Sequence, residues 1–340
     1  MAKLNKTYNF LIRIGILLFT LYYLYEQLFN KHNLQEFVKD LHSVTRYKGF
    51  WILLGLVLLL LPINLLLESY KWQKLMAKME KISLMQAFKA VSAGISVSMF
   101  MPNRVGDYLG RVFILKKADR VQATLATVLG SAAQLLSTLL FGAAAIIIFL
   151  PRWMDISISI NRWAYAGLVF GIVMLASGMV FAYLNFSAFT WILQKLSGRA
   201  YDKIAHYAIV FSWYNVKELL LVLLISLLRY LVFSFQFYIL LRIFQIPIDY
   251  YHAMVLIGLI YLIMTIIPTI ALSEVGVRGS ASLYVFSWYF GVAAMTENLN
   301  QQIVTASTAL WFINLGFPAL LGVLFVFKLK FFRKTTDHVR

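Results

Sequence analysis

The sequence of 340 residues contains no cysteine, which excludes disulfide bonds, thiolate metal ligands and cysteine nucleophiles. It is also poor in charge, since Asp, Glu, Lys and Arg make up 13% of the residues against about 25% in a typical soluble domain. None of its 5 histidines has a partner at metal-site spacing, so no metal site is predicted. Phosphate-binding loops, dinucleotide fingerprints and Ser-His-Asp arrangements are also missing, so the sequence predicts no cofactor and no catalytic residue.

Hydrophobic residues are abundant instead, at 61% of the chain. Runs of this kind that are long enough to cross about 30 Å of hydrocarbon predict an all-α polytopic membrane protein. The first run lacks the short core and small-residue cleavage site of a secretory signal, so it is expected to be a retained span. The net charge of +17 comes from basic residues between the runs, which is typical of membrane topology and does not indicate a nucleic-acid partner. Six full spans are predicted at 9–28, 50–70, 121–150, 162–186, 218–244 and 303–328.

A short charged motif occurs twice in this apolar sequence. The first motif covers residues 102–111 and the second motif covers residues 268–279. Each contains a proline, then an acid, then an arginine four residues after the acid, with glycine nearby. Charge inside membrane sequence is costly, so a repeated charged pattern is expected to have a use. The residues expected to break the helices at the two motifs are Pro102, Gly106, Gly110, Pro268, Gly276 and Gly279.

The regions around the motifs, 84–118 and 249–292, each read as two short apolar segments. Each is expected to form a re-entrant hairpin or a pair of tilted spans. Six full spans and two hairpins make eight membrane elements if each hairpin is counted as one. Residues 1–160 and 161–340 then share the plan of span, span, broken hairpin and span. Three crossings per half predict an inverted repeat within one integral membrane domain. Most of the 31 Lys and Arg fall on one side of this plan, so both termini are predicted to be cytoplasmic.

Each motif places its acid and its arginine on one face of a helix. Asp107 and Arg111 form one such pair, and Glu274 and Arg278 form the other. Two interpretations remain open. The pairs either neutralise charge locally so that the hairpin tips can enter the bilayer, or they form an anion site with the broken helix ends. Arginine suits phosphate because its planar group donates two parallel hydrogen bonds, and helix N-termini add unpaired N–H groups.

Other polar residues lie inside predicted spans. Arg229 lies near the middle of 218–244, so it should face the protein interior and pair with an acid. Asn64 and Glu68 occupy the corresponding span of the first half. These residues are either a structural buried pair or part of a polar pathway. A polar stripe in 121–150 either packs helices together or lines a headgroup groove, and it comprises Thr124, Thr127, Ser131, Gln134 and Thr138. Residues 201–211 have helical spacing of apolar residues and predict a short interfacial helix.

The two motifs resemble those of the lysylphosphatidylglycerol synthase transmembrane-domain family, also called flippase-like membrane proteins. That family has a Pro-x-Arg-x-Gly-acid…Arg segment, matched by Pro102 to Arg111, and a Pro…Gly-Val-Arg segment, matched by Pro268 to Arg278. This chain has Asp107 where Glu is usual and Gly279 where Glu commonly follows the arginine. The resemblance implies a bacterial inner-membrane protein from a group of proposed lipid translocators. The chain has no room for the family's aminoacyl-transferase domain, so it is not expected to make lysyl-lipid.

The leading hypothesis is translocation of an anionic phospholipid or lipid-linked headgroup, with anionic membrane lipids as partners. An alternative is a polyprenyl-phosphate-dependent membrane transferase, and another is an accessory or scaffold subunit of an envelope-biosynthesis enzyme. Transport of a small solute or ion is a further alternative, and the oligomeric state is left open. The residues expected to bind the anion are Arg104, Arg111, Arg229 and Arg278, and those expected to neutralise charge or carry a coupling proton are Asp107, Glu274 and Glu68.

Overall fold

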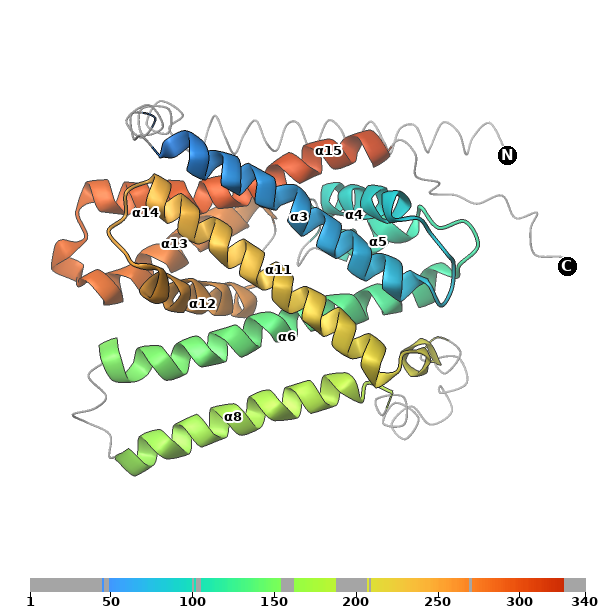
Figure 1. Ribbon diagram of the computed structural model, residues 1–340, viewed down its shortest axis with the longest axis horizontal. Coiled ribbons are helices and arrows are strands. Elements are labelled where there is room, and N and C mark those ends of the chain that lie inside the picture. Colours follow the sequence, from blue (N-terminus) through green and yellow to red (C-terminus); the bar gives the residue numbers. More distant parts are fainter. Residues whose placement is uncertain are drawn as a thin grey trace, which may run out of the picture.

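The computed structural model describes residues 45, 49–99, 101, 105–153, 162–187, 207, 209–268 and 271–326. Within these ranges the chain forms helices and no strand (Figure 1). The predicted span at 9–28 and two residues of the first motif, Pro102 and Arg104, lie outside the described residues.

Five helices of the described part are long and apolar enough to cross a membrane. They are α3 (Phe50–Met76), α6 (Arg120–Trp153), α8 (Arg162–Leu184), α11 (Val216–Ile243) and the continuous stretch formed by α14 (Glu297–Trp311), η6 (Phe312–Gly316) and α15 (Phe317–Val326). They correspond to five of the six predicted spans, and they make the chain a multi-pass membrane protein. Helix α3 continues past residue 70, the predicted end of the second span, to Met76, and Lys71 is buried in this extension beside Glu68.

The two weaker regions each contain a pair of helices, as predicted. The first pair is α4 (Leu84–Ser98) and α5 (Val105–Val112), and the second is α12 (Tyr250–Ile266) and α13 (Ala271–Phe290). Pro268 lies at the break of the second pair. The role predicted for the glycines needs correction: Gly106 and Gly110 lie within α5, while Gly276 and Gly279 lie within α13. Both breaks precede these glycines, which therefore do not interrupt the helices.

The glycines of the first motif instead allow two helices to touch. A Cβ atom added to Gly110 would lie 2.6 Å from the Cα atom of Gly94 on α4. A Cβ atom on Gly106 would lie 2.5 Å from the carbonyl oxygen of Val97. Real Cβ atoms do not come this close to backbone atoms, so α4 and α5 pack together only because these positions lack a side chain.

Each hairpin begins with a side chain that caps its first helix. The Ser83 hydroxyl accepts a hydrogen bond from the backbone N–H of Gln86, whose side chain accepts one in return from Ser83 N–H. At α12 the cap is Asp249, which accepts from the backbone N–H of His252. A hydrogen bond from the His252 side chain lowers the pKa of the Asp249 carboxyl. Such caps satisfy donors that a helix start leaves free, so they define where each hairpin begins.

Helices from the two sequence halves pack against each other. Helix α4 lies against α15, and α12 lies against α6. Small residues again permit the contact: a Cβ atom on Gly322 of α15 would collide with the Ser92 carbonyl of α4, and one on Gly258 of α12 would lie 2.9 Å from the Ala145 Cβ of α6. In both cases the first helix of one half's hairpin meets the last span of the other half.

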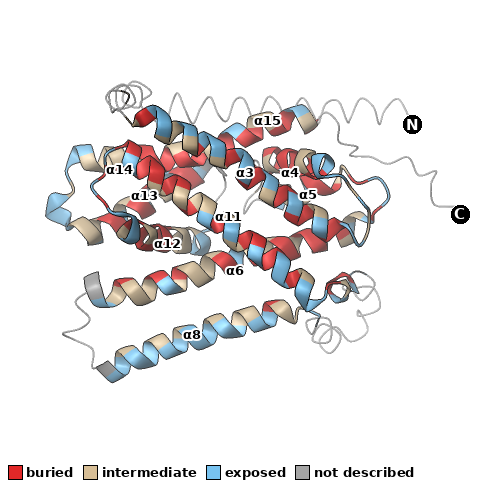
Figure 2. Cartoon of the chain, viewed as in Figure 1, coloured by how far each residue is buried: buried red, intermediate tan, exposed pale blue. Residues whose placement is uncertain are grey.

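Helices α3 and α11 pack side by side, and α8 lies at the edge of the bundle (Figure 1). Only 6% of the most apolar 18-residue segment of α8 is buried, compared with 28–50% of the corresponding segments of the other four spans. Figure 2 shows exposed residues along much of α8, whereas α3, α6 and α11 carry buried residues toward the centre. Apolar exposure of this kind matches a helix that faces lipid.

The connection before α11 contains the 3₁₀ helix η4 (Ile209–Trp213). Most of the interfacial helix predicted at 201–211 lies outside the described residues. The Tyr214 hydroxyl donates a 2.6 Å hydrogen bond to the Leu75 carbonyl oxygen near the end of α3. Burial raises the pKa of the Tyr214 phenol, so its proton stays in place and the bond ties this connection to α3.

Candidate functional site

A cavity of about 620 Å³ lies among α3, the hairpin α4–α5, α6, α11, the hairpin α12–α13 and the α14–η6 stretch. Residues of both motifs line it, although they are far apart in the sequence. Four basic and three acidic side chains face this one space, all from the described part of the chain. They are Lys71, Arg111, Arg229 and Arg278 with Glu68, Asp107 and Glu274.

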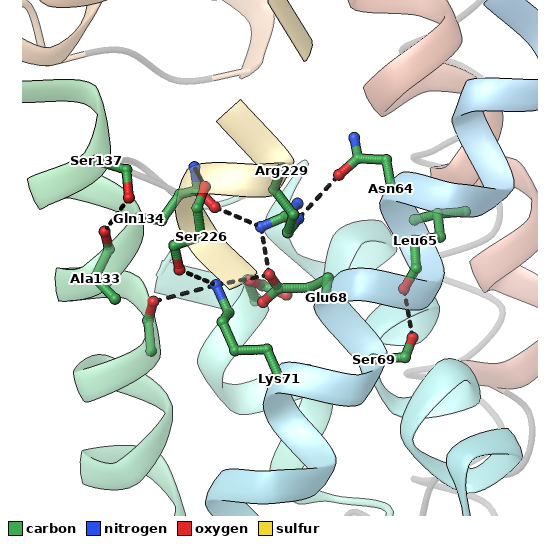
Figure 3. Close-up of polar contacts among 12 residues, drawn as sticks. Asn64, Leu65, Glu68, Ser69, Lys71, Ala133, Gln134, Ser137, Ser226 and Arg229 are labelled. Carbon is green, nitrogen blue, oxygen red and sulfur yellow. Dashed lines mark hydrogen bonds and ion pairs between the residues drawn. The ribbon is translucent and has the colours of Figure 1, made fainter. Parts of the chain in front are cut away.

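Glu68 of α3 is the hub of the charged cluster (Figure 3). Its Oε1 atom accepts a 2.5 Å hydrogen bond from Nη1 of Arg111, and its Oε2 atom lies 2.8 Å from Nζ of Lys71. Nη1 of Arg229 also donates to Oε2. Glu68 is 5% exposed, so three cations from α3, α5 and α11 converge on one buried carboxylate.

Arg229 joins the central helices. Its Nε atom donates to Oδ1 of Asn64 at 2.9 Å, and Nη1 donates to Oε1 of Gln134 on α6 at 2.9 Å. The pairing of this mid-span arginine with an acid is therefore as predicted. Asn64 in turn donates to Oδ1 of Asn314, which lies in the π-helical turn η6. Such turns interrupt the regular helix ladder and occur frequently at functional sites.

Lys71 was not predicted as a site residue. Its ammonium donates to the Gly130 carbonyl oxygen at 3.2 Å and to Oγ of Ser226 at 3.3 Å, in addition to pairing with Glu68. At 2% exposure it is among the most buried side chains described. In the sequence, its position three residues after Glu68 on the same helix face was the available signal.

The first motif forms a two-pronged ion pair. Nε and Nη2 of Arg111 donate to the two carboxylate oxygens of Asp107 at 2.8 and 2.5 Å. Because Nη1 of Arg111 is bound to Glu68, all three nitrogens of the guanidinium have an acidic partner. Planar two-point pairing of this kind is among the strongest that side chains form.

The second motif forms a looser pair. Nη2 of Arg278 donates to Oε1 of Glu274 at 2.8 Å, and the guanidinium carbon lies 5.8 Å from the centre of the Tyr261 ring. The Nε atom of Arg278 is buried and has no hydrogen-bond partner among the described residues. A buried donor without a partner is costly, so Arg278, which lines the cavity, has its hydrogen-bonding capacity less fully used than Arg111 does.

The predicted polar stripe of α6 packs against α3 at one end and lines the cavity at the other. Thr127 accepts a 3.0 Å hydrogen bond from the Trp72 indole and so joins α6 to α3. Ser131, Gln134 and Thr138 line the cavity. The Thr124 hydroxyl donates to the Arg120 carbonyl within its own helix. Packing therefore accounts for one end of the stripe and the cavity wall for the other.

The cavity has a polar interior and an apolar rim. Leu135 of α6 and Ile266 and Ile267 of the α12–α13 turn line it, yet they are 47, 72 and 39% exposed. Leu135 lies in the middle third of its span. Exposed apolar side chains and buried charged ones therefore line the same cavity. An arrangement with surplus arginine inside and apolar groups outside suits an anion that carries a hydrophobic part.

A family model described as "Lysylphosphatidylglycerol synthase TM region" matches residues 10–322 of the chain. The match spans all the described helices that carry the cavity, together with the predicted first span. A search of curated proteins returned no match, and a search of solved structures returned none either.

Proposed function

The chain belongs to the lysylphosphatidylglycerol synthase transmembrane-region family, and from this premise we propose that it moves an anionic phospholipid or lipid-linked headgroup between the leaflets of a bacterial inner membrane. One observation carries the proposal: two charged motifs from distant parts of the sequence meet at one cavity among membrane-spanning helices. Charged side chains are rare at such depth and commonly mark a substrate pathway.

The charge of the cavity supports an anionic substrate. Its four basic groups outnumber its three acids among the described residues. Arg278 is the group best suited to receive a phosphate, because it has one acidic partner and a buried Nε donor without an acceptor. Arg229 lies across the same cavity and already bonds neutral amides that a phosphate oxygen can displace. An arginine fork donates two parallel hydrogen bonds to phosphate, so these two side chains together would hold one headgroup.

The rim supports a lipid rather than a soluble anion. A headgroup that enters past Leu135 and Ile266 can leave its hydrocarbon chains in the bilayer beside these apolar side chains. Burying apolar area at about 25 cal/mol per Å² makes this contact favourable for a lipid. A small hydrophilic ion would gain nothing from such a rim.

The packing of the helices supports alternating access by an inverted repeat. The pairing of α4 with α15 is matched by the pairing of α12 with α6, which is what two related halves exchanging their hairpins would produce. In transporters of this type one repeat rocks against the other around a site near the middle of the membrane. The cavity, bounded by both hairpins, is the fixed site of that motion in this proposal.

Transport of fluorescent anionic lipids across liposome membranes tests the proposal. We expect purified protein to move labelled phosphatidylglycerol between leaflets, and Arg278→Gln to slow this at least about tenfold, equivalent to about 1.4 kcal/mol. The double variant Glu274→Gln with Arg278→Gln removes both charges of the pair, so it leaves no orphaned acid and should be equally inactive. Arg242→Gln, at an exposed arginine near the end of α11, is the matched control and should retain transport.

The result would be read together with a folding check by size-exclusion chromatography. Folded Arg278 variants that transport as fast as the control would rule out this cavity as the lipid pathway. Absence of transport by the folded parent protein with every lipid tested would instead favour the scaffold or transferase interpretation.

A further inference from the structure

Among the described residues, the buried cluster around Glu68 holds one positive charge more than its acids balance. Two acids, Glu68 and Asp107, face Lys71, Arg111 and Arg229. Glu274 and Arg278 form a separate pair within α13, on another wall of the same cavity. An uncompensated charge in a buried site is costly because the charge is removed from water. The empty site is therefore expected to release a proton, whereas the occupied site is balanced by the negative charge of the bound anion.

Only one of the three cations can change its charge. Arginine remains protonated at any pH a protein meets, whereas a buried lysine ammonium can release its proton. We propose that Lys71 is the proton-carrying group of the cavity, so that one proton is bound with each singly charged anion and released with it. This inference rests on the proposed anion site. It further identifies Lys71 as the residue that couples proton binding to transport, and it assigns one negative charge to the substrate.

The surroundings of Lys71 accommodate both of its states. As an ammonium it has three hydrogen-bond donors, and three acceptors are in place: Glu68, the Gly130 carbonyl and Oγ of Ser226. As a neutral amine it has two donors and one lone pair. The Ser226 hydroxyl, which now donates to the Val222 carbonyl at 3.0 Å, lies close enough to Nζ to turn and donate to that lone pair. Loss of the proton therefore leaves no hydrogen-bonding group stranded.

The other charged groups around Lys71 do not offer the same switch. Glu68, on the same helix, is held by three cations. Asp107 on α5 is bound at both oxygens by Arg111. Helix α6 presents the Gly130 carbonyl and Gln134, which carry no charge, and α11 presents Ser226 and Arg229. An anion that binds beside Arg229 and the ammonium supplies the missing charge, because it brings the cluster to neutrality while Lys71 is protonated.

Neutrality is reached with one negative charge, which specifies the substrate class. A phosphodiester, as in phosphatidylglycerol, carries one negative charge over the neutral pH range. A phosphomonoester such as phosphatidic acid carries between one and two, since its second proton dissociates near pH 6. The site should therefore prefer phosphodiester lipids, and a doubly charged headgroup would leave it with an excess of negative charge.

The test measures binding of short-chain phosphatidylglycerol to the purified full chain over a pH series, together with proton uptake in weakly buffered solution. The ligand's charge is constant over this range, so any pH dependence belongs to the protein. We expect affinity to fall as pH rises, by up to about tenfold per pH unit once Lys71 is neutral in the free protein, with about one proton taken up per lipid there. Lys71→Arg should bind with no pH dependence and no proton uptake. Lys71→Met should bind weakly at every pH.

Lys74→Met is the matched control, since Lys74 lies on the same helix but is exposed, and it should behave like the parent protein. Retention of the full pH dependence and proton uptake by a folded Lys71→Arg variant would overturn the assignment of Lys71, while the anion site would stand. Lipid binding by the parent protein that does not change with pH would also overturn the assignment of Lys71 and leave the anion site in place. Absence of lipid binding by the parent protein at any pH would instead overturn the proposed function, and this inference with it.

Discussion

The two charged motifs have the same spacing of acid and arginine but different surroundings. Arg111 lies between Asp107 and the hub carboxylate Glu68, and each of its three nitrogens has an acidic partner. Arg278 has one acidic partner, an aromatic ring and a buried Nε donor without an acceptor. Helical spacing determines that each pair forms, whereas neighbouring helices determine how much binding capacity each arginine retains. The first motif thus joins helices, and the second retains a free donor.

The glycines differ between the motifs in the same way. Gly106 and Gly110 lie where α5 touches α4, and neither position has room for a side chain. No described residue lies within 4 Å of a Cβ atom added to Gly276, and one added to Gly279 would be 3.7 Å from the Val304 side chain, an ordinary contact distance. The tighter packing at the glycines of the first motif agrees with the difference between the two arginines. This comparison leads to three tests by substitution.

The largest expected effect comes from neutralising one acidic partner of each motif's arginine, which is Glu68 for Arg111 and Glu274 for Arg278. Glu68→Gln removes the carboxylate shared by three cations, so it should lower the free energy of unfolding by about 3–5 kcal/mol. Glu274→Gln breaks one pair beside the open cavity and should cost less, about 1–3 kcal/mol. Thermal unfolding of both variants in the same detergent measures the difference. Equal losses would mean that Glu68 is not the hub of the cluster.

Much of this arrangement follows from the sequence because it depends on local spacing. The long apolar runs predict the spans that the structure describes, and the four-residue spacing of Asp107 and Arg111 predicts their ion pair. The cost of charge in a membrane predicts that Arg229 has an acidic partner. Each of these inferences uses only one helix or one energetic rule, so the rest of the fold is not needed.

The remainder depends on contacts between distant segments. Lys71 looks like a loop lysine at the end of an apolar run, and its burial follows from the packing of α6 and α11 over it. The roles of Gly106 and Gly110 follow from the approach of α4, which no pattern within the motif encodes. The sequence therefore predicts which residues are charged or small, while tertiary packing decides which of them share a cavity.

Conservative exchange of the arginines should separate the two motifs. Lysine cannot reproduce a three-nitrogen fork, so Arg111→Lys should destabilise the protein by about 2–3 kcal/mol through the lost bonds to Asp107 and Glu68. Arg278→Lys replaces one hydrogen bond to Glu274 with another and should change stability by less than about 1 kcal/mol.

Lipid binding should not follow stability in these variants, because Arg278→Lys, the more stable of the two, is expected to lose affinity. Arg278→Lys loses the second donor of the fork, so it should bind phosphatidylglycerol more weakly while remaining stable. Unfolding in detergent and lipid titration of the same samples provide both readings. A stable Arg278→Lys variant with unchanged affinity would show that Arg278 only neutralises Glu274 and does not bind the lipid.

The smallest effect is expected from adding one methyl group to a glycine of each motif. At Gly110 the methyl group would lie 2.6 Å from the Gly94 Cα atom, so Gly110→Ala must separate α4 from α5 and should cost about 1–3 kcal/mol. At Gly276 the same group enters open space, and Gly276→Ala should stabilise α13 by up to about 1 kcal/mol because alanine is the better helix former. Opposite shifts in the midpoint of thermal unfolding would support the contrast between a packed and an open motif. A loss of stability at both positions would show that α13 closes against a neighbour at Gly276, and the second motif would then be as tightly packed as the first.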